Sequence, residues 1–274
     1  MVQWYPGHMA RAKREIKENL KKVDLIIEVL DARIPRSSRN PELKELLNDQ
    51  EHIIVLNKVD LAVNKITEKW KRHLRKKNTV VLINSLKKIG ISSLMRILNK
   101  KYIENKNSHN ILKVMIAGVT NSGKSTLINA ITGKNKVKTG KKPGVTRGQQ
   151  WIKVNKNIYL LDTPGILWPK FEDKEVGYKL ALTGAINRDV FDIELVSYKL
   201  IQYLMDITPE KLEEQYNINI TNLDAYEVFK LIGKSRGCLQ SGGRIDKHRT
   251  ANIILNDFQK GKFQRISLEK PVES

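Results

Sequence analysis

The sequence predicts an α/β fold followed by a region of helices, and three observations lead to that prediction. Short apolar runs, among them VDLIIEVLD (23–31) and HIIVLNK (52–58), alternate with stretches of helical character. A Gly-rich pattern lies between one such run and a helix. From about Lys174 the apolar runs stop, and amphipathic stretches follow one another. We therefore expect one parallel-rich sheet flanked by helices, and a second domain that contains helices alone.

The elements can be placed in chain order. Strands are expected at 23–31, 52–58, 79–84, 111–118, 149–154 and 157–162. Helices are expected at 9–22, 41–49, 63–77 and 90–102, from Lys124 onward, and then at 175–187, 192–206, 209–216, 224–234 and 247–258. The predicted domains are therefore 1–173 and 174–274. We expect the last dozen residues to form a loose tail.

Positive charge is concentrated in the first two thirds of the chain. The net charge is +21, yet residues 179–274 carry 14 Lys and Arg against 13 Asp and Glu. The excess includes KITEKWKRHLRKK (65–77) and KNKVKTGKKPGVTR (134–147), the second without an acidic residue. A polyanionic partner is indicated, and nucleic acid is favoured over membrane because neither run lies on a strongly apolar helix. The alternative is a Lys-rich solvated surface.

Composition also excludes several classes of protein. The single cysteine, Cys238, rules out an internal disulfide, and no Cys or His cluster has the spacing of a zinc site. The N-terminal segment lacks the apolar core of a signal peptide, and no segment approaches the roughly 18 unbroken apolar residues of a membrane span. We expect a soluble, cytoplasmic, monomeric protein.

A phosphate-binding loop is predicted at GVTNSGKS (118–125), which matches G-x-x-x-x-G-K-[ST] directly between a strand and a helix. Gly118 and Gly123 allow backbone N–H groups to surround a phosphate at a helix N-terminus. Lys124 would neutralise the β- and γ-phosphate oxygens, and the Ser125 hydroxyl would bind Mg²⁺. The residues expected to contact the nucleotide here are Asn121, Ser122, Gly123, Lys124, Ser125 and Thr126.

Two further segments complete the expected phosphate and magnesium site. YLLDTPG (159–165) is a strand that ends in Asp162, which would hold Mg²⁺ through water, and in Gly165, whose N–H would contact the γ-phosphate. PGVTRG (143–148) supplies Thr146, whose hydroxyl and carbonyl are suited to close over Mg²⁺ and the γ-phosphate. The position of Thr146 between the other two motifs is the reason for assigning it.

Guanine recognition is predicted earlier in the chain, at NKVD (57–60). The Asp60 carboxylate can accept hydrogen bonds from guanine N1–H and N2–H₂, which adenine does not offer. Asn57 and the stem of Lys58 would brace the loop and the base. In INSLKK (83–88), the turn at Ser85 and Leu86 would offer a backbone N–H to guanine O6.

The predicted guanine-recognition motifs precede the phosphate-binding motifs in the chain, and this order is the reverse of that in an ordinary GTPase. Together with WYPGHMARA (4–12), DARIPRSSRNP (31–41) and PGVTRGQQ (143–150), this order makes the chain resemble the circularly permuted GTPases of the ribosome biogenesis GTPase A family, also called the YlqF family. The resemblance covers essentially the whole chain. One departure is Leu86, where this loop more often carries Ala, but only a backbone N–H is needed there.

The resemblance implies a P-loop GTPase fold with permuted motif order and a C-terminal helical RNA-binding domain. It implies a GTP-hydrolysing assembly factor that is activated by a precursor of the large ribosomal subunit and binds its rRNA. GTP or GDP and Mg²⁺ are the expected ligands. It also suggests that Asn121 helps to ligate K⁺, with bracing of the loop as the alternative role.

The resemblance also favours His8 as the catalytic residue. Ile166 stands where many GTPases carry a Gln that orients the attacking water, so another residue must supply this contact. His8 lies in a Pro-Gly turn, and an imidazole can orient or deprotonate water near neutral pH. The alternative is a surface or capping histidine.

Two other functions remain open from the sequence. One is an RNA-binding module that turns GTP over very little, and the other is a GTPase that acts on the small subunit. Because Ile166–Asp173 lead directly into the helical domain, loss of the γ-phosphate is expected to move that domain and to make the protein a nucleotide-gated RNA clamp. RNA contacts are expected from both domains, including KSRGCLQSGGRIDKHR (234–249), whose cations are Lys234, Arg236, Arg244, Lys247 and Arg249.

Overall fold

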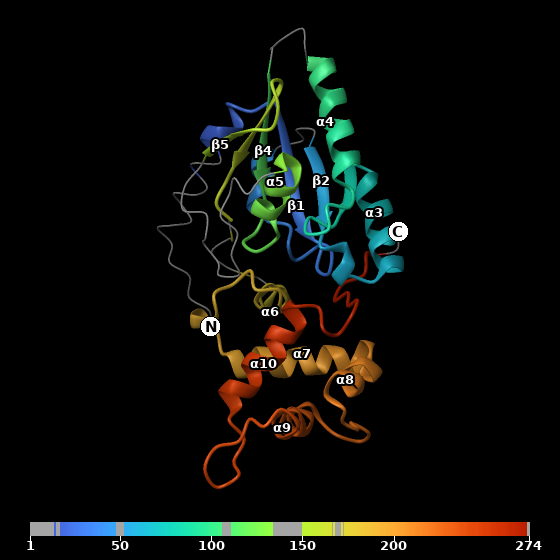
Figure 1. Cartoon of the computed structure of the whole chain (residues 1–274), viewed down its shortest axis with the longest axis vertical. Coiled ribbons are helices and arrows are strands. Elements are labelled where there is room, and N and C mark those ends of the chain that lie inside the picture. Colours follow the sequence, from blue (N-terminus) through green and yellow to red (C-terminus); the bar gives the residue numbers. More distant parts are fainter. Residues whose placement is uncertain are drawn as a thin grey trace.

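The computed structural model describes residues 14, 17–47, 52–105, 111–133, 150–165, 167, 171 and 173–272. Figure 1 shows a sheet with helices on both faces, and a group of helices beyond one end of its strands. In the predicted helix at 9–22, residues 9–13, 15 and 16 lie outside the described residues, and residues 17–20 are helical. The basic run 134–147 and the motif PGVTRG (143–148) also lie outside the described residues.

The sheet has six strands in the order β3-β2-β1-β4-β6-β5. Their bounds are Leu25–Asp31 (β1), His52–Asn57 (β2), Thr79–Ile83 (β3), Leu112–Ala117 (β4), Gln150–Lys153 (β5) and Ile158–Asp162 (β6). All neighbouring pairs are parallel except β5 and β6. Strands β1 and β2 are buried at every position, as expected for central parallel strands covered on both faces. The predicted α/β fold with a parallel-rich sheet is confirmed.

Within the described residues, two pairs of helices cover the two faces of the sheet, and the helical residues 17–20 add Leu20 to the face of α2. Helices α4 (Ile91–Asn105) and α5 (Lys124–Thr132) pack on the face that carries Ile27 and Val29 of β1. Helices α2 (Pro41–Leu47) and α3 (Asn64–Arg75) pack on the opposite face, where Trp70 of α3 is buried. A 3₁₀ helix, η1 (Val59–Leu61), follows β2.

The C-terminal region is built on α7, which contacts α6, α8, α9 and α10. The bounds are Lys174–Leu182 (α6), Arg188–Val190 (the 3₁₀ helix η2), Ile193–Ile207 (α7), Pro209–Tyr216 (α8), Ala225–Ser235 (α9) and Lys247–Gln259 (α10). Asp side chains cap the N-termini of α6, α7, α9 and α10. Ile34 and Val119 from the loops of the sheet region join the apolar core of these helices. A domain boundary after residue 173 therefore stays a prediction, because the two regions share core residues.

The predicted helix at 175–187 is too long. Helix α6 ends at Leu182, since Gly184 adopts a left-handed conformation (φ +77°). Ala185 N–H donates to the Leu180 carbonyl, and Gly184 N–H donates to the Ala181 carbonyl, which together form a Schellman motif. Beyond the end of α6, the carbonyls of Thr183 and Ala185 face the sheet region, where they accept hydrogen bonds from Asn121 and Thr120.

The predicted loose tail is also wrong. Phe263, Ile266, Ser267 and Glu269 are buried, and the segment 260–270, here named the C-terminal strap, returns to the sheet region beside α3 (Figure 1). The strap escapes periodicity analysis because backbone groups and a few buried side chains, not a helix or strand, hold it in place.

The strap is bonded to several parts of the sheet region. Ile266 N–H donates to the Leu61 carbonyl at 2.9 Å, and Trp70 Nε1 donates to the Glu269 carbonyl at 3.1 Å. The Glu269 carboxylate accepts the backbone N–H of Arg36 at 2.7 Å. These bonds fix the strap against the 3₁₀ helix that follows β2 and against the loop that follows β1.

No helix within the described ranges is long and apolar enough to cross a membrane. In the same part of the chain, no group of three or more His, Cys, Asp or Glu side chains has the geometry of a metal site. Cys238 is a buried free thiol.

Candidate functional site

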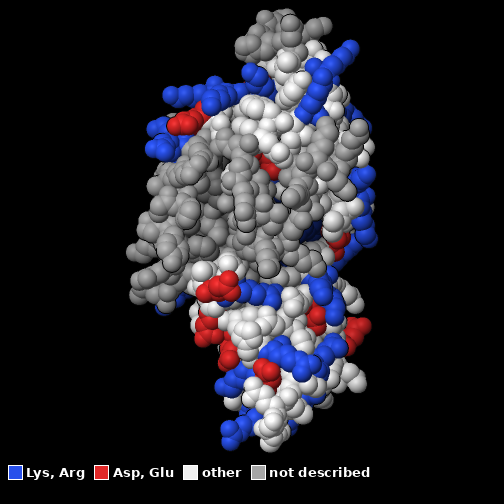
Figure 2. Space-filling view, turned by 60° about the vertical axis from the view of Figure 1, so that its left-hand side comes forward, with Lys and Arg blue, Asp and Glu red and all other residues white. Residues whose placement is uncertain are grey.

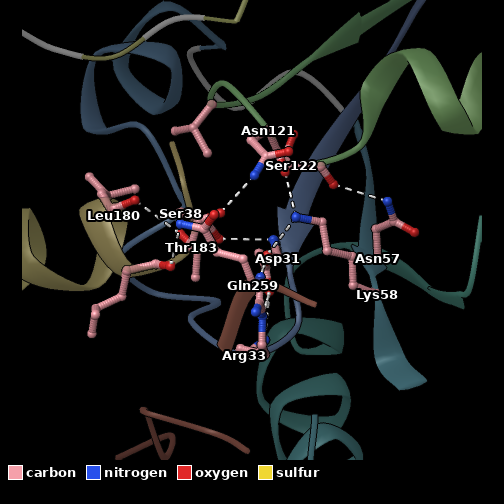
Figure 3. A network of polar contacts seen from close by, with 12 residues as sticks. Asp31, Arg33, Ser38, Asn57, Lys58, Asn121, Ser122, Leu180, Thr183 and Gln259 are labelled. Carbon is pink, nitrogen blue, oxygen red and sulfur yellow. Dashed lines mark hydrogen bonds and ion pairs between the residues drawn. The ribbon is translucent and has the colours of Figure 1, made fainter. Parts of the chain in front are cut away.

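The predicted site residues lie at the carboxyl ends of the parallel strands, on the edge of the sheet that faces the C-terminal helices (Figure 3). Asn57 ends β2, Asp162 ends β6, and the loop 118–123 follows β4. In open parallel sheets, the crevice outside this edge is the usual ligand-binding position. Separate segments of the sequence are therefore brought together where a ligand is expected.

The loop 118–123, called the phosphate loop below, leads into the N-terminus of α5. Gly123 has φ +98°, and a Cβ atom there would lie 2.2 Å from Asn57 Nδ2. A side chain at this position is excluded both by backbone strain and by the neighbouring loop. Lys124 begins α5, and its Nζ donates to the carbonyls of Gly118 at 3.0 Å and Val119 at 2.9 Å. Ser122 is buried, and Ser125 and Thr126 are half-buried.

Asp162 and Lys124 form a buried, incompletely balanced pair of charges. Burial raises the pKa of Asp162 to about 6, although the positive charge of Lys124 opposes this shift. Burial lowers the pKa of Lys124 to about 8, with Asp162 opposing. Within the described part of the chain, neither Asp162 carboxylate oxygen has a hydrogen-bond partner. Hard oxygen donors of this kind suit a divalent cation such as Mg²⁺.

The loop after β2, called the guanine loop below, is tied to both of its neighbours through Asn57. Asn57 Nδ2 donates to the Ser122 carbonyl at 2.9 Å, and Asn57 Oδ1 accepts the Ser85 hydroxyl at 2.8 Å and the Ser85 N–H at 3.2 Å. Lys58 has φ 60°, and its Nζ donates to the carbonyl of Asn121. The side chains of the guanine loop thus hold the phosphate loop and the turn after β3 in one assembly.

Asp60 and Leu86 lie in the segments that follow β2 and β3. Asp60 lies in η1 and is half-buried, so its carboxylate is accessible to a ligand. The Leu86 side chain is 82% exposed, and the Ser85 N–H is already used by Asn57. The Leu86 N–H has no acceptor among the described residues, and it is the better donor in this turn for a ligand.

The phosphate loop also contacts the segment released at the end of α6. Asn121 Nδ2 donates to the Thr183 carbonyl at 2.7 Å, and the Thr120 hydroxyl donates to the Ala185 carbonyl. Gly165 lies against the other side of this loop, because a Cβ atom there would lie 2.6 Å from Thr120 Cα. The phosphate loop is therefore fixed between the sheet and the C-terminal helices.

Three residues singled out from the sequence cannot be placed. His8, Thr146 and Ile166 lie outside the described residues. Sequence analysis also missed polar neighbours of the predicted site, namely Asp31, Arg33 and the carbonyls of Thr183 and Ala185. Two signals would have indicated them. A polar pair directly after a buried strand points to Asp31 and Arg33, and a Gly at the end of an amphipathic stretch points to the carbonyls.

A parallel sheet with a guanine loop after β2 and a phosphate loop after β4 defines a P-loop GTPase with circularly permuted motif order. A family model described as "50S ribosome-binding GTPase" matches residues 113–230. Ribosome biogenesis GTPase A of Bacillus cereus is 42% identical over 100% of this chain and 95% of its own length. The chain belongs to the ribosome biogenesis GTPase A family, and it is a GTP-binding and GTP-hydrolysing enzyme.

Relatives and solved structures from Thermotoga maritima agree. Its ribosome biogenesis GTPase A is 31% identical over 98% of this chain and 95% of that protein. A GDP-bound YlqF structure matches with a TM-score of 0.70 and 27% identity, covering 95% of this chain and 100% of that one. A GNP-bound YlqF structure from T. maritima matches with a TM-score of 0.68, 28% identity and coverage of 96% and 100%. The match over both regions supports the fold described above.

Proposed function

We propose that this GTPase is an assembly factor for the large ribosomal subunit, which binds a precursor particle through its rRNA and is stimulated by that particle to hydrolyse GTP. The observation that carries the proposal is the meeting of the guanine loop, the phosphate loop and the C-terminal helices at one edge of the sheet. A change at the nucleotide can act on the helices through these bonds. We further propose that it works as a monomer in the cytoplasm.

Guanine specificity is assigned to Asp60, whose carboxylate accepts from guanine N1–H and N2–H₂. Asn57 and Lys58 hold the loop in place, and the turn at Ser85 and Leu86 donates a backbone N–H to guanine O6. Adenine would cover the Asp60 carboxylate without offering its two donors, which costs binding free energy.

The phosphates are assigned to the phosphate loop and to the N-terminus of α5. Backbone N–H groups of 121–126 surround the phosphates, and Lys124 turns from the carbonyls of its own loop to the β- and γ-phosphate oxygens. The Gly165 N–H contacts the γ-phosphate. Ser125, Thr146 and, through water, Asp162 would hold Mg²⁺, which when bound neutralises charge on the phosphate oxygens.

Hydrolysis requires a water molecule held in line with the γ-phosphate, and we assign the orientation or deprotonation of this water to His8. Asn121 is assigned a second role as a ligand of K⁺. Its Nδ2 is engaged with the Thr183 carbonyl, which leaves the side-chain Oδ1 to face a cation.

Contacts with rRNA are assigned to basic surfaces on both regions. Helix α3 buries Trp70 and Leu74 and exposes cations on its other side, which are Lys65, Lys69, Arg72 and Arg75. The segment 234–249 spans the end of α9, the connection after it and the start of α10, and all five of its cations are exposed. Figure 2 shows Lys and Arg side chains at the far end of the helical region, with acidic groups scattered above them.

A groove of about 440 Å³ lies next to the basic side of α3. It lies between the start of α3, α8 and the strap, and Lys65, Lys211 and Arg265 supply its charge. The lining contains no acidic side chain, so a phosphate of the RNA backbone fits its chemistry. One RNA segment can therefore contact both regions at once.

The test is cosedimentation of the protein with separated large and small ribosomal particles, with GDP or with a non-hydrolysable GTP analogue. We expect binding to large-subunit precursors that is stronger with the analogue, and faster GTP turnover in their presence. If about five phosphates are neutralised, the log–log slope of affinity against salt should be roughly −4. Preference for small particles, or a flat salt profile, would contradict the assignment of partner and surface.

A further inference from the structure

Asp31 lies between the two nucleotide loops, although neither loop contains it (Figure 3). Its Oδ2 lies 3.0 Å from Lys58 Nζ in the guanine loop. The same ammonium donates to the carbonyl of Asn121 in the phosphate loop. Lys58 thus connects the two loops while its charge is balanced by Asp31.

Arg33 holds this carboxylate in one orientation. Arg33 Nε donates to Asp31 Oδ1 at 3.0 Å, and Arg33 Nη2 donates to Oδ2 at 2.8 Å. Such a bidentate pair fixes direction as well as distance. Arg33 is 2% exposed, and a cation buried to this degree is strongly destabilising without its partner.

Helix α10 and the strap hold Arg33 in turn. Arg33 Nη1 donates to the Phe258 carbonyl at 3.4 Å, and the guanidinium carbon lies 5.0 Å from the centre of the Phe258 ring. The Arg33 carbonyl accepts the Leu268 N–H at 3.0 Å. A continuous series of contacts therefore runs from α10 through Arg33 and Asp31 to Lys58.

The charges of this cluster depend on one another. Burial alone would raise the pKa of Asp31, but Arg33 and then Lys58 hold it well below its usual value. Burial lowers the pKa of Lys58, and the neighbouring charge of Arg33 lowers it further, whereas Asp31 raises it. Without the carboxylate, the buried Arg33 and the half-buried Lys58 would lack a counter-charge, and we expect Lys58 to leave its position.

We propose that Asp31 and Arg33 are positioning residues for guanine-nucleotide binding: Arg33 acts through Asp31, and Asp31 acts through Lys58. The inference rests on the proposed guanine site. It adds that α10, some 200 residues downstream of the guanine loop, supports that site and contributes to the affinity for GTP and GDP.

The test compares Asp31→Asn with Glu28→Gln, a matched control on the same strand. Glu28 is also buried and also pairs with an Arg, at 3.1 Å from Arg39 Nε, but it contacts neither nucleotide loop. In the full-length protein, we expect Asp31→Asn to weaken binding of fluorescent GDP about 30-fold or more, the cost of unpairing a buried charge. Glu28→Gln should change it less than about threefold, although urea unfolding should show that both variants lose stability.

A second series keeps the inference testable if Asp31→Asn does not fold. Arg33→Met should weaken GDP binding more than Arg33→Lys, which retains the charge without the bidentate geometry. Phe258→Leu, which retains the backbone carbonyl, should weaken it about threefold. GDP affinity that is the same across this series would overturn the inference.

The outcomes separate this inference from the proposed site. Equal GDP affinity in Asp31→Asn and Glu28→Gln, with GDP binding lost in Asp60→Asn, would overturn the positioning role alone. Equal large losses in Asp31→Asn and Glu28→Gln would show a merely structural role and would overturn it too. Retained GDP binding in Asp60→Asn would instead overturn the guanine site itself.

Discussion

The guanine side and the phosphate side of the site are built on different physical principles. On the guanine side, the polar atoms of the Asn57 and Lys58 side chains already have protein partners. Asn57 is bonded to Ser122 and Ser85, and Lys58 is bonded to Asn121 and paired with Asp31. On the phosphate side, Asp162 is buried without a hydrogen-bond partner among the described residues. In the same part of the chain, Lys124 donates to the carbonyls of Gly118 and Val119 in its own loop. In the proposed site, the base would meet a preorganised surface, whereas the phosphates and a cation would complete a region that is electrostatically unbalanced without them.

The prediction with the largest expected effect tests whether the guanine side recognises the base. Asp60→Asn replaces an acceptor by a donor, so affinity for GTP should fall on the order of 1,000-fold while xanthosine triphosphate gains. Titration with both nucleotides measures the change. Unchanged GTP affinity would remove the guanine loop from the site.

The next effect concerns catalysis on the phosphate side. His8→Ala, assayed with saturating large-subunit particles, should keep GTP binding and lose roughly 10- to 1,000-fold in stimulated turnover, as for loss of a group that positions or deprotonates water. Full particle-stimulated hydrolysis in the variant would exclude His8 and turn attention to a group donated by the ribosome or to the K⁺ site at Asn121.

Preorganisation of the guanine side predicts a cost in stability. Asn57→Ala leaves the Ser122 carbonyl and the Ser85 hydroxyl buried without their partner, so the nucleotide-free protein should lose about 2–3 kcal/mol in its free energy of unfolding. Urea unfolding without nucleotide measures this loss. A change below about 0.5 kcal/mol would mean that the loop is not preorganised.

The phosphate side predicts a smaller change of the opposite sign. Because burial raises the pKa of Asp162 from 3.8 to about 6, its ionised form costs stability above pH 6, and this cost disappears as the pH falls toward 4. Without nucleotide or Mg²⁺, Asp162→Asn should be more stable than the parent protein by on the order of 1–2 kcal/mol at pH 7.5. The difference should vanish near pH 4. A variant less stable than the parent at pH 7.5 would show that Lys124 already compensates the buried charge of Asp162 in full.

Local sequence patterns predicted the sheet and the nucleotide loops well, because both depend on short-range features. The apolar runs gave all six strands within a few residues, and GVTNSGKS lies between β4 and α5 as expected. The sequence did not predict contacts between distant segments. From the sequence alone, Arg33 resembles a surface cation in a polar loop. The structure shows that it is buried between Asp31 and Phe258.

The C-terminal strap also depends on contacts between distant segments, which local sequence patterns do not predict. Its position near the end of the chain determines when these contacts can form during synthesis. Val63 N–H donates to the Ser267 hydroxyl oxygen, and these residues are 204 positions apart. At roughly 5–20 residues per second, a ribosome needs on the order of 10–40 s to reach the strap after the guanine loop has been synthesised. During that interval the nascent chain has its guanine motif but lacks the segment that supports it. Competence to bind GTP is therefore expected to arise late in synthesis, when the strap has emerged and docked.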